Sequence, residues 1–588
     1  MIRLIASIVL LAFSAAAQAE VARFSPYDNR TVVAEELLSL ADQKTADGGI
    51  LRQGVLGSFN SLNLMSFKGI FPASGRFAHD SLMVAAPNDL HAFHGLLAKR
   101  FLVSDDYSKV LIELDPDARW HDGTPVTAED VKFTVETVLA NSSFALRLAL
   151  GPITVTIADD LTLTMENGKK GSWQWLQTAA TYPIQSSAYW RGKDTSASTM
   201  DIPLGSGPYK IVSAEPNRQV VLERARDYWA ADHPVNADRW HFDRISVDYF
   251  TEPSAVGQAL IAGGIDILLE TDATRWRAGY DSPSLTRGDI VKTAIGNNGI
   301  VVVPALFFNL RRSIWQDLRV RTALKYAIDT DFLNRITGEV YKPAVSYFGS
   351  LPHAATGVPT SAEAEVLAEF EDDFPAGAFA SPTPSFSVSG LSQRDRFRRA
   401  SALLQAAGYQ VINGQRIDPA TGQPMSLDLL ITDATIARRL APITEWFSDL
   451  GIELKVDLQD AAIFVERRNA QDYDLLFLSL NHSGLPGFVE NFFWHSRFAA
   501  TGFSISGLEN RAVDAFIDQM QSTRELEKIT VAAQAFDRFM RWNVYALPLW
   551  QQDETWFVHA SGLIPPTGSA ALSAPAVFWK WSAAENRN

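Results

Sequence analysis

The chain has 588 residues, 47% of them hydrophobic, and it contains no cysteine. A chain of this length is expected to form about two to four domains, and the absence of cysteine excludes disulfide frameworks, zinc–thiolate sites and cysteine nucleophiles. The formal net charge of −15 at pH 7 argues against non-specific nucleic-acid binding, because such binding needs a basic surface.

The N-terminus has the pattern of a cleavable secretion signal. Arg3 precedes an apolar stretch over residues 4–13, and residues 17–19 read Ala-Gln-Ala, the pattern of a cleavage site. The stretch is shorter than the ~20 residues that span a bilayer, and no later apolar run reaches that length. We expect residues 1–19 to be removed, so that Glu20 becomes the first residue; the alternative is a buried N-terminal helix. Without a cysteine for lipid attachment, the mature chain is expected to be soluble and periplasmic.

Helical periodicity is visible at several places along the chain. Thr127 is a potential N-cap for a helix whose apolar residues recur from Val131 to Leu139. The same spacing predicts helices over residues 320–328 and 513–520.

A capping-box pattern predicts another helix start in the middle of the chain. Thr360 and Glu363 have the spacing of this motif and lead into an apolar segment. The acidic residues over 369–373 then predict a solvated helix face, with a metal site as the weaker alternative.

Strand and helix patterns alternate in the region from 425 to 480. Apolar residues alternate with period two over 425–431 and 452–458, which is typical of strands, and recur at helical spacing over 436–450. Residues 474–480 form a further apolar, strand-like run. This succession of elements predicts an α/β domain.

We found no pattern typical of an enzyme. His91 and His94 lie three residues apart without a matched third ligand, and surface histidines are the simpler interpretation. Gly205-Ser206-Gly207 does not have the spacing of a nucleophile elbow, and no phosphate-binding glycine loop follows a strand. The sequence therefore predicts no catalytic residues, no metal and no cofactor.

An ordered set of motifs resembles the family 5 solute-binding proteins of bacteria. The segments are Asp47–Arg52, Ser61–Asn63, Trp120–Val131, Gly205–Tyr209, Glu223–Trp229, Ala262–Asp266 and Phe308–Leu324. Phe308–Arg312, the acidic insertion near 363–373, and Arg541–Asn543 followed by Pro548 and Trp550 resemble the YejA-like branch in particular. Their order and their spread over most of the chain make the resemblance specific.

This resemblance implies an α/β, bilobal periplasmic-binding-protein fold of the cluster C type, with an extra third domain and two hinge crossovers. The expected first lobe comprises residues 20–58, 200–295 and 545–588. The extra domain is expected over 59–199, and the second lobe over 296–544. Hinge bending would close the lobes over a peptide or peptide-like ligand and create the surface that the permease subunits of an ABC importer recognise. The resemblance also implies a monomer.

The resemblance and the polar residues around its motifs give a set of candidate ligand-binding residues. They are Asn60, Ser61, Asn63, Asn309, Arg311, Arg312, Asn481, His482 and Ser483. Arg311 and Arg312 are candidates for a bidentate clamp on a ligand carboxylate, with exposure to solvent as the alternative.

The sequence departs from many peptide receptors of the family after the strand at 474–480. Those receptors carry an acidic residue there that pairs with the amino terminus of the peptide, whereas residues 481–486 of this chain contain no Asp or Glu. Because a buried ammonium without a counter-charge is costly, either another acid takes this role or the ligand has no free α-amino group. We therefore expect an N-blocked or acidic peptide such as a cell-wall muropeptide, with ordinary oligopeptides as the broader alternative.

Three classes of function remain after this step. A transport receptor is favoured by the secretion signal together with the ordered motifs. A receptor on the same fold with a sensor or chaperone role, and without a cognate permease, is the alternative. A hydrolase would require a catalytic constellation that the sequence does not contain.

Overall fold

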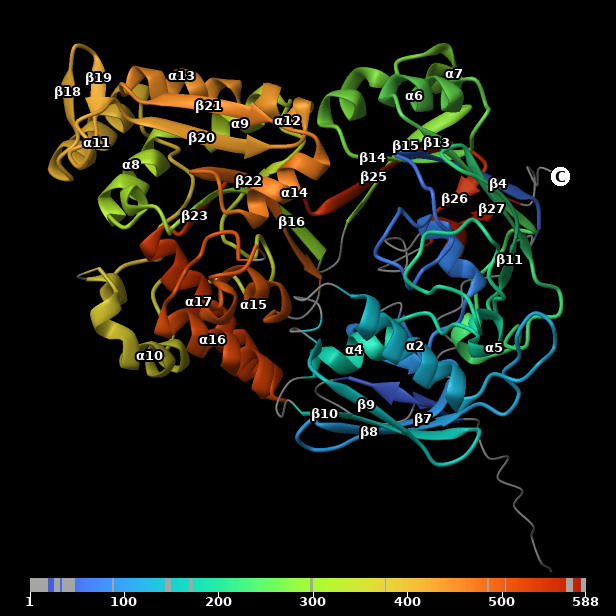
Figure 1. The fold of residues 1–588 in the computed structure, drawn as a ribbon. Coiled ribbons are helices and arrows are strands. Elements are labelled where there is room, and N and C mark those ends of the chain that lie inside the picture. The colour runs from blue at the N-terminus through green and yellow to red at the C-terminus, as the bar shows by residue number, and fades with distance from the viewer. Residues whose placement is uncertain are drawn as a thin grey trace, which may run out of the picture.

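A computed structural model gives the fold of the chain (Figure 1). The structure describes residues 20–25, 32–33, 48–86, 89–142, 147, 150–168, 173–296, 300–375, 377–483, 486–502, 504–566 and 575–582. The predicted signal segment, residues 1–19, lies outside these residues. Within the described part, no helix is both long enough and apolar enough to cross a membrane.

The first lobe is built on a seven-stranded sheet in the order β11-β12-β13-β4-β14-β25-β15. β4 runs parallel to β13 and β14, and β25 runs antiparallel to β14 and β15. The carboxyl ends of β4, β13, β14 and β15 therefore lie at the edge where β25 begins. The strands are β4 (Ile50–Leu56), β11 (Tyr209–Glu215), β12 (Gln219–Arg224), β13 (Arg244–Phe250), β14 (Ile267–Glu270), β15 (Ile290–Gly296) and β25 (Glu554–Ala560), with helices α6 (Pro253–Ile261), α7 (Pro283–Arg287) and α18 (Pro575–Phe578).

The second lobe contains a five-stranded sheet in the order β21-β20-β22-β16-β23. β20 is parallel to β21 and β22, whereas β16 is antiparallel to β22. The strands are β16 (Ile300–Phe308), β20 (Ser426–Ile431), β21 (Glu453–Leu458), β22 (Leu475–Ser483) and β23 (Ala546–Pro548). These bounds confirm the three strands predicted between residues 425 and 480.

The helices of the second lobe confirm the predicted helices over 320–328 and 513–520. They are α8 (Leu318–Ala327), α9 (Thr330–Ile336), α10 (Ser361–Leu367), α11 (Gln393–Ala406), α12 (Ala434–Arg439), α13 (Ala441–Asp449), α14 (Ala461–Asn469), α15 (Phe488–Trp494), α16 (Arg511–Ser522) and α17 (Leu526–Asn543). The prediction of a single helix over 436–450 is wrong. It is divided into α12 and α13, because Pro442 lacks a backbone N–H and sits in the first turn of a new helix.

The third part of the chain is an antiparallel domain. Its four-stranded sheet has the order β7-β8-β10-β9 and is covered by α2 and α4 (Figure 1). The elements are β7 (Ala98–Val103), β8 (Lys109–Leu114), β9 (Ile153–Ile157), β10 (Thr162–Asn167), α2 (Ala128–Asn141), α4 (Gln174–Thr181) and α5 (Ser187–Trp190). Thr127 caps α2 as predicted, in a capping box with Asp130.

A smaller three-stranded sheet of β2 (Arg23–Phe24), β6 (Asp89–Gly95) and β5 (Met83–Ala86) accompanies the antiparallel domain. His91 and His94 both lie on β6, and His94 is buried, which contradicts its predicted surface position. Residues three apart on a strand point to opposite faces of the sheet, so these two histidines are not arranged to share a ligand.

Two crossovers join the lobes. One leads from β15, which ends at Gly296, to β16, which begins at Ile300; the other leads from β24 (Trp550–Gln551) to β25. Val302 and Gln552 form a bridge between the two crossover segments. The crossovers therefore run side by side.

Strand pairing changes two of the expected domain boundaries. Residues 546–548, assigned above to the first lobe, form β23 and pair with β16 of the second lobe. Residues 23–24, also assigned to the first lobe, pair with β6 beside the antiparallel domain. In both cases a short strand at the end of a segment joins the neighbouring sheet, which no local pattern in the sequence indicates. The remaining boundaries stay a prediction.

A buried ion pair fastens α10 to α17 in the second lobe. The Arg538 guanidinium lies 2.8 Å from the Glu363 carboxylate, and their side chains are 1% and 2% exposed. Glu363 is also the capping-box residue of α10 and accepts a hydrogen bond from the backbone N–H of Thr360. The predicted capping box is thus confirmed, and its carboxylate has a second, tertiary role.

We expect Arg538→Met to lower the free energy of unfolding of the second lobe by about 3–5 kcal/mol, because it leaves the buried Glu363 charge without its partner. Denaturant unfolding measures this loss. The control is Arg511→Met, which removes the exposed ion pair with Glu369 and is expected to cost about 0–1 kcal/mol. Equal costs for the two variants would contradict this prediction.

Candidate ligand site between the lobes

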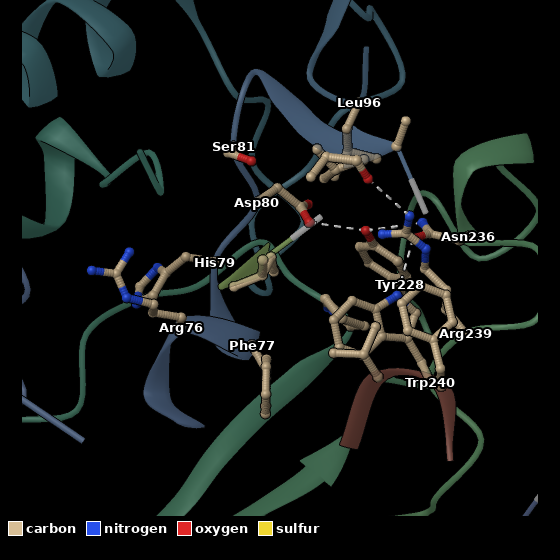
Figure 2. A pocket seen from close by; sticks show the side chains of 17 residues that line it. Arg76, Phe77, His79, Asp80, Ser81, Leu96, Tyr228, Asn236, Arg239 and Trp240 are labelled. Carbon is tan, nitrogen blue, oxygen red and sulfur yellow. Dashed lines mark hydrogen bonds between the residues drawn. The ribbon is translucent and has the colours of Figure 1, made fainter. Parts of the chain in front are cut away.

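A cavity of about 330 Å³ lies where three parts of the chain meet (Figure 2). The segment 76–86 that leads into β5 lines one side, and residues 236–240 before β13 line another, together with Phe578 of α18. Ile300 also lines the cavity, and it is the first residue of the second lobe after the crossover. The volume is at the lower end of the roughly 300–1,000 Å³ of small-molecule sites.

Asp80 is a buried acid on the wall of this cavity. It is 3% exposed, and its carboxylate accepts a hydrogen bond from the Tyr228 hydroxyl at 2.9 Å (Figure 2). It also accepts one from the Trp229 indole N–H at 2.8 Å. Burial raises the pKa of Asp80 to about 7, although these hydrogen bonds act in the opposite direction. Asp80 is therefore partly protonated near neutral pH.

Arg239 supplies a positive charge to the same cavity. Its guanidinium donates a hydrogen bond to the Ala85 carbonyl at 3.4 Å and stacks over the Phe578 ring at 4.9 Å. Burial lowers the pKa of Arg239 to about 10, so the group stays protonated at neutral pH. Phe77 and Trp240, whose rings meet edge to face at 5.6 Å, add aromatic surface. The cavity thus combines a cation with apolar faces.

His79 is a buried histidine next to Arg76 at another side of the cavity (Figure 2). It is 6% exposed, and neither ring nitrogen has a hydrogen-bond partner among the described residues. Burial, followed by the charges of His121 and Arg76, lowers the pKa of His79 to about 3. The ring is neutral under ordinary conditions.

Polar groups from the two lobes also meet directly. Asp272 follows β14 in the first lobe and lies 3.8 Å from the guanidinium of Arg439, the last residue of α12 in the second lobe. Arg439 donates a hydrogen bond to the Tyr341 hydroxyl at 3.2 Å, and its guanidinium carbon lies 5.0 Å from the ring centroid of Tyr341 and 5.2 Å from that of Trp550. Asp272 lies in the loop after β14, and Arg439 lies in the helix after β20. The carboxyl end of each strand faces the other lobe. Such edges are where α/β sheets bind ligands.

The structure does not bring the predicted carboxylate clamp near Asn309 to the cavity. The Arg311 guanidinium donates to the carbonyls of Ala499 and Ser504, and the buried Asn309 donates to those of Gln471 and Tyr473. Both side chains therefore hold loops of the second lobe. The half-exposed Arg312 lies 3.7 Å from Asp472 at the surface.

The position of these residues leads to the same conclusion. Phe308 is at the opposite end of β16 from the crossover residue Ile300. At a rise of about 3.3 Å per residue, roughly 26 Å separates the two ends of the strand. Asn309, Arg311 and Arg312 follow that distal end.

The candidates after β4 hold their own loop together. Asn63 is fully buried and donates to the carbonyls of Thr195 and Ala197, and Ser61 accepts a hydrogen bond from the Asn63 backbone. Asn60 accepts a hydrogen bond from the backbone N–H of Ile70. Burial of Ser61 and Asn63 contradicts a direct ligand contact in this arrangement, whereas Asn60 is exposed.

The third set of candidates lies at the crossover end of β22, where Val301 and Val302 of β16 pair with His482 and Asn481. Asn481 is exposed, and Ser483 ends the strand. His482 is buried, and its Nδ1 lies 3.1 Å from the carboxylate of the buried Glu490. Burial alone would raise the pKa of Glu490, but contact with His482 lowers it overall. A buried acid is thus present here, ten residues beyond the predicted strand end at residue 480, at the start of α15.

Sequence analysis missed Asp80, Arg239, Asp272 and Arg439. Asp80 and Arg239 lie outside the segments that carry the family resemblance, and we made no prediction for either residue. Asp272 carried a usable signal, because polar residues that directly follow a buried strand mark the carboxyl edge of a sheet. Arg439 carried none, since it lay inside a segment predicted as one continuous amphipathic helix.

The titrations of His79 and Asp80 are expected to change stability in opposite directions. The lowered pKa of His79 contributes stability at pH values above 6.5, the pKa of histidine in the unfolded chain. This stability is lost as pH falls from 6.5 toward 3. The raised pKa of Asp80 contributes stability below 3.8, which is lost as pH rises toward 7. Between about pH 4 and 6.5, each group changes the unfolding free energy by about 1.4 kcal/mol per pH unit, and the two effects cancel.

Single variants should uncover these slopes. Relative to the wild type, His79→Gln should become less stable as pH rises through this window, and Asp80→Asn should become more stable. Denaturant unfolding at about pH 4.5 and about pH 6.5 measures both. Parallel pH profiles for the two variants would contradict the assignment.

Comparison with known proteins places the chain in a family. A model of the bacterial extracellular solute-binding proteins, family 5, matches residues 92–501. A probable peptide-binding protein YejA of Agrobacterium fabrum is 30% identical over 92% of this chain and 90% of its own length. The peptidoglycan-binding protein YepA of the same organism is 29% identical over 87% of this chain and 86% of its own length.

A solved structure agrees with the fold. The oligopeptide-binding protein AppA of Bacillus subtilis, in complex with a nonapeptide, superposes with a TM-score of 0.68 at 17% identity, covering 92% of this chain and 100% of its own. With two lobes, two crossovers and a matching family model, this chain belongs to the family 5 bacterial extracellular solute-binding proteins, in the YejA-like branch.

Proposed function

We propose that this chain is the periplasmic substrate-binding subunit of an ABC importer, which captures a peptide or peptide-like ligand by closure of its lobes and delivers it to the membrane permease. The observation that carries the proposal is the cavity lined by the antiparallel domain, the first lobe and Ile300 of the second. Membership of a solute-binding family supports binding and release of the ligand without chemical conversion.

The charge of the site supports a ligand that carries carboxylate groups. Arg239 presents a guanidinium to the cavity, and a guanidinium binds a carboxylate through two parallel hydrogen bonds. Its stacking on Phe578 covers one face and leaves the N–H edges for a ligand. The aromatic surfaces of Phe77 and Trp240 suit the apolar parts of a peptide.

The buried acids near the lobe contact support a ligand without a free amino terminus. Asp80 is hydrogen-bonded by Tyr228 and Trp229, and Glu490 accepts a hydrogen bond from the backbone of Gly487 beside His482. Asp272 accepts a hydrogen bond from the backbone of Arg275 and lies near Arg439. The Asp80 carboxylate is hydrogen-bonded by two side chains, and the second oxygens of Asp272 and Glu490 lie close to Arg439 and His482 without a hydrogen bond within the described part of the chain. An incoming ammonium would therefore compete with these neighbours for each acid.

An N-blocked acidic peptide satisfies both conditions, and a muropeptide is such a molecule. Its peptide is joined to a sugar through an amide at the amino end, and its stem carries free carboxylates. The peptidoglycan-binding name of a relative at 29% identity supports this class of ligand.

We expect the protein to bind an N-acetylmuramyl tripeptide more tightly than the same tripeptide with a free amino terminus, because an ammonium would compete with the groups that already lie beside the buried acids. Arg239→Gln should weaken binding of the muramyl tripeptide roughly 10- to 100-fold, the usual effect of losing hydrogen bonds to a charged group. Isothermal titration calorimetry measures both differences.

The matched control is Arg335→Gln. Arg335 also stacks on an aromatic ring, that of Phe332, but lies on α9 in the second lobe and does not line the cavity. Tight binding of free peptides but not of muramyl peptides would show a general oligopeptide receptor. Unchanged affinity in Arg239→Gln would place the ligand outside this cavity.

A further inference from the structure

Arg524 connects two parts of the chain that are more than 400 residues apart in sequence. It lies between α16 and α17 of the second lobe and donates to the carbonyls of Ser104 at 2.9 Å and Asp105 at 2.6 Å. A second nitrogen of its guanidinium lies 3.5 Å from the Asp105 carboxylate. The guanidinium carbon also lies 4.3 Å from the centroid of the Tyr107 ring. One side chain therefore makes hydrogen bonds, an ion pair and a cation–π contact with the antiparallel domain.

The receiving surface is the turn between β7 and β8, and it is well anchored. Tyr107 is 2% exposed and belongs to the core of the antiparallel domain. Its carbonyl accepts a hydrogen bond at 2.8 Å from the indole N–H of the buried Trp175. The Asp106 carboxylate accepts hydrogen bonds from the hydroxyls of Ser104 and Ser108 across the turn. The turn is thus held in place without Arg524.

The other side of the contact is equally fixed. α17 follows Arg524 directly, and its buried Asp537 accepts hydrogen bonds from Ser346, from the backbone of Ala355 and from Arg541. Arg538 of the same helix pairs with Glu363. A movement of the turn relative to Arg524 therefore requires a movement of the whole second lobe relative to the antiparallel domain.

This contact lies away from the hinge. Figure 1 shows the end of α16 beside the four-stranded sheet, on the opposite side of the molecule from the place where β25 enters the first lobe. Two crossovers alone leave a bilobal protein free to bend. Opening about these crossovers would break the Arg524 contact, because its two sides belong to different rigid parts.

We propose that the antiparallel domain works as a clasp, whose 104–107 turn holds the second lobe closed through Arg524 and thereby slows ligand release. The clasp depends on movement of the lobes and not on which ligand they enclose. Its strength is moderate, because the Arg524 side chain is 35% exposed. Lysine cannot replace it fully, because an ammonium lacks both the second nitrogen that lies near the Asp105 carboxylate and the planar face that lies over the Tyr107 ring.

The chain contains no cysteine, so two introduced cysteines give a specific pair of fluorescent labels. We suggest Lys99→Cys in the antiparallel domain and Asp372→Cys in the second lobe, both at exposed positions. Single-molecule energy transfer on the ligand-free protein then reports the open and closed populations. Arg524→Ala is expected to raise the ratio of open to closed molecules roughly 10-fold, and Arg524→Lys to give a smaller increase.

Arg511→Ala is the matched control, because it removes an exposed arginine of α16 whose ion pair, with Glu369, stays within the second lobe. Cooperative thermal unfolding by circular dichroism confirms that each variant is folded. An unchanged distance distribution in Arg524→Ala, or an equal change in Arg511→Ala, would overturn the clasp. Either result leaves the proposed ligand class untouched, because this measurement contains no ligand.

Discussion

The two sheets of this chain are joined by two crossover segments that run side by side, and the arrangement of every group between the lobes depends on this pairing. β16 leaves the first crossover, β25 enters from the second, and the bridge between Val302 and Gln552 keeps them together. The carboxyl edge of the first sheet therefore faces the crossover end of β22. Asp272 and Arg439 meet across this boundary only because their strands end on facing edges.

Charges near the lobe contact are buried together with specific partners. Asp80 is held by Tyr228 and Trp229, and Glu490 by His482 and its own helix start. A buried carboxylate that already has partners does not favour an additional cation, whereas the guanidinium of Arg239 has aromatic and backbone contacts that leave its edges available. This asymmetry between acids and Arg239 favours an acidic ligand over a basic one.

The sequence was most informative where one local pattern determines an element. Alternation over 425–431 and 452–458 predicted β20 and β21, and Thr127 predicted the start of α2, because period and capping are properties of neighbouring residues. The resemblance to a family supplied the bilobal arrangement. Local patterns could not predict that residues 546–548 would join the second sheet, since that pairing depends on a strand more than 200 residues away.

The site could be predicted only in part, for the same physical reason. The Arg311 guanidinium could clamp a carboxylate, but it donates instead to the carbonyl of Ala499, which is 188 residues further along the chain. Arg239 and Asp80 lie 159 residues apart in sequence and line one cavity only after the antiparallel domain packs on the first lobe. A polar side chain is able to bind a ligand, but long-range packing decides whether its hydrogen bonds are already made within the protein.

Native mass spectrometry of the protein, purified from the cells that naturally produce it, tests the central claim most directly. The account predicts that a bound species dissociates from the protein on activation, with the mass of an acidic peptide blocked at its amino end by a sugar. A population of unmodified peptides of mixed sequence would contradict the proposed ligand class. A non-peptide solute would contradict the proposed function as well.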